Sequence, residues 1–153
     1  RLTCFSNHHE NMMFTSLNIF YDNLVLGSGP NTFRKNCNNS QYSHNSISCD
    51  NHPHNNFIQL LAETGVIGFI FVFSILMFFT YKCIVHLLNL YLRNKSLFSD
   101  YQICLICCFL VTLFPFLPTQ NFFNNWINIV YFFPVGFYLH SIYKDRQNNS
   151  IHP

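Results

Sequence analysis

The chain has 153 residues, of which 50% are hydrophobic and 18% aromatic, and only 9% are charged. A soluble domain carries about 25% charged residues, so this composition indicates an integral membrane protein. The formal net charge of +2, without a basic run, gives no support for a nucleic-acid-binding protein. The chain starts at Arg1 without a signal-like segment, which favours a C-terminal piece of a longer multi-span protein.

Residues 1–56 are polar, rich in Asn, Ser and His, and interrupted by Gly and Pro. This composition predicts an extramembrane loop with a short helix around Met12 to Phe20 and turns elsewhere. Cys37 and Cys49 both lie in this loop. They can form a disulfide if the loop faces an oxidising compartment, or they can remain free.

A long apolar segment follows this loop. It is uncharged over residues 66–81 and continues in the same character to about residue 92. This is enough for a membrane-crossing helix, which needs about 20 residues. Asn55 and Asn56 are both suitable N-cap residues, so we expect the helix to begin there.

Two further uncharged runs predict two more transmembrane helices. The predicted fold class is an all-α polytopic membrane protein, in which a periplasmic loop precedes three transmembrane helices of a larger multi-span bundle. The predicted segments are a periplasmic loop region (1–56), an interfacial turn and transmembrane helix (57–92), a cytoplasmic loop (93–100), a transmembrane helix (101–117), a periplasmic loop (118–125), a transmembrane helix (126–143) and a cytoplasmic tail (144–153).

The orientation follows from the positive charges. Arg93 and Lys95 lie in the connection between the first two predicted spans, and Lys144 and Arg146 follow the third. Cytoplasmic loops carry an excess of Lys and Arg, so this connection and the C-terminus are predicted to be cytoplasmic. Three spans then place residues 1–56 outside the cytoplasm, which is the periplasm in a Gram-negative bacterium.

The segment 26–34, LGSGPNTFR, is a candidate anion site. Gly27 and Gly29 permit a tight turn with positive φ, and the backbone N–H groups of such a turn bind anions readily. Arg34 and Lys35 follow directly, and Arg can hold a phosphate with two hydrogen bonds. The alternative interpretation is a structural turn beside a solvated basic pair.

His54 lies at the expected N-terminus of the first long helix, a position that favours a bound phosphate. It is the candidate general base, with Asn55 as a further anion ligand. The nearby Asp50 and Cys49 give a cluster that resembles a metal site, but the spacing matches no standard zinc pattern and no metal is predicted.

Glu63 precedes the uncharged stretch and admits two interpretations. It supports the site by holding Arg34 or another basic residue, or it is an interfacial carboxylate that faces water. Gly65 and Gly68 form a small-residue face on the helix, which predicts close helix packing.

At these residues the sequence resembles the O-antigen ligase and polymerase superfamily of bacterial membrane glycosyltransferases. The matching pieces are LGSGPNTFR (26–34), HPHN (52–55) and QLLAETGVIG (59–68), with a softer match at PTQNFFNNW (118–126). The resemblance implies a multi-pass enzyme of the bacterial inner membrane whose active loop is periplasmic. The family's essential loop histidine maps to His54, and a family arginine maps to Arg34.

The resemblance also implies the substrates. A glycan would pass from an undecaprenyl-pyrophosphate donor to lipid A-core in the ligase branch. In the polymerase branch the acceptor is another lipid-linked repeat, and in a third branch, the protein O-oligosaccharyltransferases, it is a protein. Membrane lipids are the other expected partners, and no cofactor is required. The upstream spans and arginines of the family are absent from this chain, which should be inactive alone.

A function of another class stays open at this point: a non-enzymatic membrane transporter or metal-binding protein. A transporter should carry ionisable residues deep within its spans, and here Lys82, His86 and His140 lie only near helix ends. This pattern counts against transport.

Overall fold

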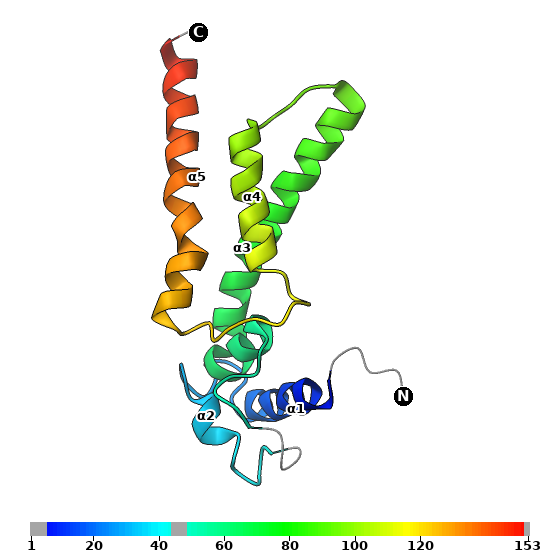
Figure 1. The fold of residues 1–153 in the computed structure, drawn as a ribbon, viewed down its shortest axis with the longest axis vertical. Coiled ribbons are helices and arrows are strands. Elements are labelled where there is room, and N and C mark those ends of the chain that lie inside the picture. The colour runs from blue at the N-terminus through cyan, green and yellow to red at the C-terminus, as the bar shows by residue number, and fades with distance from the viewer. Residues whose placement is uncertain (1–5, 44–48, 152–153) are drawn as a thin grey trace. The chain divides into compact units, whose positions relative to one another are not determined.

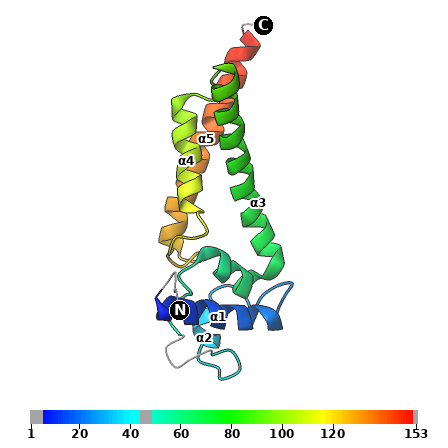
Figure 2. The same ribbon diagram turned by 90° about the vertical axis from the view of Figure 1, so that its right-hand side faces the viewer.

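The computed structural model describes residues 6–43 and 49–151, and over these residues the chain is helical without a β-strand. The all-α prediction is therefore confirmed. The helices, followed in chain order in Figures 1 and 2, are α1 (Asn7–Asp22), α2 (Phe33–Asn36), α3 (Asn56–Arg93), α4 (Asp100–Thr112) and α5 (Asn125–Ile151).

The chain divides into two compact units. The first unit contains Arg1–Ser74 together with Pro115–Ile127, and the second contains Ile75–Phe114 together with Asn128–Pro153. The division falls within α3, which contributes to both units. All the residues predicted for the site belong to the first unit.

The core of the first unit forms around α1. This helix is longer than the predicted 12–20 segment because Ser6 caps it, its side chain accepting a hydrogen bond from the N–H of His9. Its buried residues recur at helical spacing, so one face of α1 points inward. They are Met12, Thr15, Ser16 and Ile19. Met12 and Ile19 pack in one cluster with Phe33, Cys37 and Ala62.

Among the described residues, α3 is the helix that is long and apolar enough to cross a membrane. Only 28% of its most apolar window is buried, whereas the core helix of a soluble protein would be mostly buried. It begins at Asn56, as the sequence predicts, because Asn55 Oδ1 accepts the N–H groups of Phe57 and Ile58, each at 3.1 Å.

Helices α4 and α5 occupy the predicted second and third spans, but neither meets the length and composition that α3 meets. The number of spans therefore stays a prediction. α4 ends at Thr112 rather than 117, because Pro115 lacks an N–H group and disfavours a helical residue before it. α5 continues through the predicted tail to Ile151, since the segment 144–151 contains no Gly or Pro.

The second unit has a small aromatic core. The rings of Phe79 and Phe109 stack with their centroids 4.2 Å apart, and Tyr138 packs edge-on against Phe79 at 5.2 Å. Gln102 Nε2 donates a 2.6 Å hydrogen bond to Asp145 Oδ2 and so joins α4 to the extended part of α5.

Candidate functional site

A kink in α3 receives the segment that follows α1. Gly65 has φ 63° and ψ −164°, which are not helical values. In a continuous helix the N–H groups of Val66 and Ile67 would donate four residues back along the helix. Here they donate instead to the carbonyl oxygens of Leu24 (2.9 Å) and Val25 (3.5 Å). The loop therefore satisfies the donors that the kink frees.

The carbonyl groups on the other side of the kink pair with the same loop. The N–H of Ser28 donates to the carbonyl of Ala62 at 3.0 Å, and the N–H of Gly29 donates to the carbonyl of Glu63 at 2.9 Å. The kink removes two hydrogen bonds within the helix, and four hydrogen bonds between the helix and the loop replace them. Each segment therefore satisfies backbone groups that the other leaves free.

Gly27 packs closely against the backbone of α3. It has φ 68°, and a Cβ atom there would overlap the backbone of Glu63 and Thr64. Its N–H group donates to the carbonyl of Asn23 at 2.9 Å. Because the N–H groups of Gly27 and Gly29 are both engaged with main-chain carbonyls, they are not free for a pyrophosphate. The structure replaces their predicted anion-binding role with a packing role.

The turn holds instead the carboxyl group of Glu63. This side chain is 1% exposed. It accepts hydrogen bonds from the N–H of Phe33 at 2.7 Å, the N–H of Asn31 at 3.2 Å and Gln59 Nε2 at 3.0 Å. The interpretation of Glu63 as a carboxylate facing water is therefore wrong. No ion pair joins it to Arg34 in the described part of the chain.

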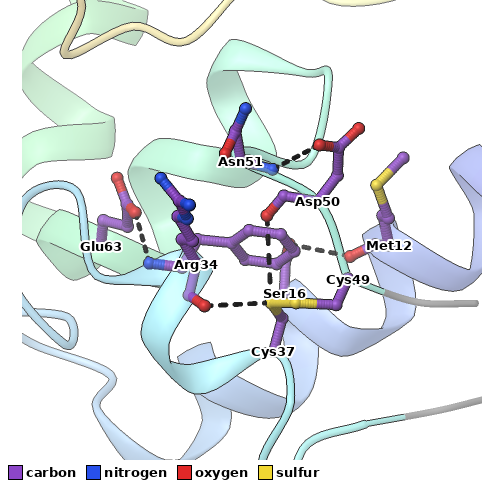
Figure 3. The surroundings of a disulfide bond; sticks show 9 residues. Met12, Ser16, Arg34, Cys37, Cys49, Asp50, Asn51 and Glu63 are labelled. Atoms are coloured by element: carbon purple, nitrogen blue, oxygen red, sulfur yellow. Dashed lines mark hydrogen bonds between the residues drawn. A yellow bond between two sulfur atoms is a disulfide. The ribbon is translucent and has the colours of Figure 1, made fainter. Parts of the chain in front are cut away.

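Arg34, on α2, lies next to a disulfide (Figure 3), and Lys35 follows it in the same helix. Arg34 and Lys35 are exposed, whereas Phe33 beside them is fully buried and anchors the helix. Cys37 is bonded to Cys49, with their Cα atoms 5.0 Å apart. The disulfide ties the turn carrying Arg34 to the segment that leads from Cys49 toward His54.

His54 adopts a left-handed backbone conformation, with φ 55°. Such a conformation costs about 1–3 kcal/mol in a residue other than Gly and is concentrated at functional sites. The N–H of Thr119 holds it by donating to the His54 carbonyl at 2.9 Å. Its Nε2 lies 3.2 Å from Asp50 Oδ2, and the side chain of His54 is 27% exposed. The imidazole is therefore both oriented by a carboxylate and open to a substrate.

Asp50 and His52 set the charges around His54. The hydrogen bond from the N–H of Asn51 and the bond to His54 lower the pKa of Asp50, so its carboxyl group stays ionised. Burial lowers the pKa of His52, which favours its neutral form. The ring of His52 lies 4.2 Å from that of His54, and its Nε2 is 3.2 Å from the carbonyl oxygen of Thr119.

A small hollow opens beside His54. It is lined by His9, Met13, Pro53, His54, Asn55 and Pro118. The ring of His9, on α1, meets that of His54 edge-on with centroids 5.2 Å apart. The sequence offered no role for His9, because only the docking of α1 brings it here.

Asn55 has a structural task in place of its predicted anion contact. Its Oδ1 caps α3, and its Nδ2 donates to the carbonyl oxygen of Pro115 at 2.7 Å. Both polar ends of the amide are therefore occupied within the protein. The carbonyl of Pro115 thus holds the Asn55 side chain, and the N–H of Thr119 holds the carbonyl of the preceding residue, His54.

Asn121, like His9, is a residue of the site that the sequence did not single out. It accepts a 2.7 Å hydrogen bond from Gln59 Nε2 and donates one of 2.9 Å to Asn31 Oδ1. Gln59 also reaches Glu63, so one polar network joins the Gly-rich turn, α3 and the segment after α4. The resemblance of the segment 118–126 was the available signal.

The described residues contain no group of three or more His, Cys, Asp and Glu side chains that could hold a metal ion. The His52, His54 and Asp50 side chains lie close together, but His52 turns its Nε2 to a backbone carbonyl.

Residues 9–73 match the family model described as O-antigen ligase. Over this region, which is less than half of the chain, the protein is similar to the O-antigen ligase family. The matched region runs from His9 on α1 through the Gly-rich turn, the disulfide, His54 and the Gly65 kink. No curated protein and no solved structure matches the chain.

The O-antigen ligase family is a family of membrane proteins, and α3 is apolar enough for that setting. The matched family is one of ligase enzymes with a glycosyltransferase-like role in lipopolysaccharide biosynthesis. The substrates of that family are glycans and lipids in general terms.

Proposed function

We propose that the protein transfers a glycan from undecaprenyl pyrophosphate to an acceptor such as lipid A-core, on the periplasmic face of the bacterial inner membrane. The observation that carries the proposal is the His54–Asp50 pair, held in a strained conformation inside the region that matches the O-antigen ligase family. The three-span topology with cytoplasmic connection and tail is part of the proposal.

The Asp50 carboxylate assigns the atoms of His54 to their roles. An ionised carboxylate only accepts hydrogen bonds, so Nε2 of His54 carries the proton that Asp50 receives. In a neutral imidazole, Nδ1 is then the acceptor. We assign Nδ1 as the atom that takes the proton from the acceptor hydroxyl.

In the transfer, one bond at the anomeric carbon replaces another, and the proton of the acceptor hydroxyl passes to Nδ1 of His54. The acceptor oxygen attacks the anomeric carbon, the bond from that carbon to the pyrophosphate oxygen breaks, and undecaprenyl pyrophosphate leaves as an anion. Arg34 and Lys35, exposed on α2 and tied through Cys37–Cys49, would neutralise its charge. Gly27, Gly29, Asn55 and Glu63 support this turn by packing and internal hydrogen bonds rather than by touching the donor.

The experiment that tests the proposal supplies the complete protein, reconstituted in lipid, with a lipid-linked glycan and lipid A-core. We expect the core to gain glycan, seen as a mobility shift on a gel. No transfer to this or any other offered acceptor would contradict the enzyme proposal. In cells, a deletion strain whose lipopolysaccharide lacks all O-chain indicates the ligase branch, whereas a single repeat indicates the polymerase branch.

Replacing Asp50 by Asn should lower the transfer rate at least about tenfold while leaving the KM for donor nearly unchanged, because the amide can hold the wrong tautomer of His54. Steady-state kinetics of the reconstituted protein measure both quantities. Asp100→Asn, at an exposed carboxylate in the first turn of α4, is the matched control. Equal loss in both variants would remove Asp50 from the site.

A further inference from the structure

Leu24, Val25 and Leu26 form an exposed apolar run in an otherwise polar region. Their exposed fractions are 49%, 62% and 73%. Tyr21, at the end of α1, is also exposed. Consecutive apolar side chains that all face outward mark an interaction surface when they cluster in this way.

The run lies beside the start of the long apolar part of α3. The carbonyl groups of Leu24 and Val25 accept the N–H groups of Val66 and Ile67, the first residues after the Gly65 kink. From that point α3 is uncharged up to Lys82. The run is therefore pinned to the start of the segment that crosses the membrane.

Part of the backbone of the run suits a lipid environment. The carbonyls of Leu24 and Val25 are engaged with α3, and the N–H of Gly27, which follows the run, donates to the carbonyl of Asn23. Lipid-exposed backbone must have its polar groups satisfied internally. Tyr21 adds an amphipathic ring of the kind enriched at membrane–water interfaces.

We propose that Leu24, Val25 and Leu26 insert into the surface layer of the lipid bilayer and anchor the first unit there. This loop segment adds apolar surface next to that of α3, although it is not part of the helix. If the proposed function is right, it also holds the Arg34 turn at the depth of a lipid-linked pyrophosphate. The anchor itself does not depend on glycan transfer.

Tryptophan fluorescence in phosphatidylcholine nanodiscs tests the anchor. The single tryptophan is removed by Trp126→Phe, and Val25→Trp or, as a second variant, Leu26→Trp is introduced into the full chain. Both side chains are mostly exposed, so the larger ring can be accommodated. Ile70→Trp, on the exposed apolar surface of α3, is the membrane reference, and Asn38→Trp, in the exposed turn after α2, is the water reference.

We expect the tryptophans at 25 and 26 to be quenched by lipids brominated near the headgroup and protected from iodide. The water reference should show the reverse. Quenching by iodide to the extent seen at position 38 would overturn the proposal. Protection from both quenchers would overturn it as well, since protein rather than lipid would then cover the run. Neither readout requires activity, so a failed transfer assay leaves this result intact.

Discussion

Replacing His54 by Ala in the complete protein is expected to lower the rate of glycan transfer by about 10²–10⁴-fold, the usual contribution of a general base. The side chain is open to the hollow beside α1, and Asp50 orients it. The His54 side chain is partly exposed and does not belong to the buried core. Its replacement by alanine should therefore leave folding intact, and the protein should still accumulate in the membrane. Transfer to lipid A-core, measured with reconstituted protein, reports the loss.

His140→Ala is the matched control for this variant. His140 is exposed on α5, in the other unit, so its loss should leave transfer unchanged. His52→Ala is a second comparison within the site. His52 contacts His54, but its Nε2 lies against the Thr119 carbonyl, so this variant should lose less transfer activity than His54→Ala. Undiminished transfer by the His54 variant would exclude His54 as the base.

The parts of the fold that local signals determine could be predicted from the sequence. The start of α3 follows from the capping side chain of Asn55, and its apolar character follows from the uncharged run after Gly65. His54 was identified as the candidate base by its place beside that cap. Its pairing with Asp50 spans only four residues and stays within the same loop.

Contacts between distant segments could not be predicted. The Gly-rich turn does direct backbone N–H groups at an acceptor, but that acceptor is the carboxyl group of Glu63, which lies 30 residues away from its donor Phe33. Likewise, Gly65 was expected on a helix-packing face, and the structure places a loop there instead. A single Gly in an apolar run carries no signal of a kink, since membrane helices tolerate it.

Gly65→Ala is expected to destabilise the first unit by about 3 kcal/mol or more. The backbone conformation of Gly65 is one that only glycine adopts readily, and the added Cβ would overlap the carbonyl group of Val25. Relief of that overlap would pull the loop away and free the N–H groups of Val66 and Ile67. Thermal unfolding in detergent should show a melting temperature lower by roughly 6 °C or more.

Gly136→Ala provides the control within the same chain. Gly136 lies inside α5, and a Cβ there meets nothing within 4 Å. Because alanine is the better helix former by about 1 kcal/mol, this variant should be as stable as the parent or slightly more so. If both glycine variants have the melting temperature of the parent, the hydrogen bonds between the kink and the loop do not stabilise the fold. A lower melting temperature for Gly65→Ala alone, together with faster proteolysis in the segment 23–29, would show that the contact between this loop and the kink in α3 stabilises the fold.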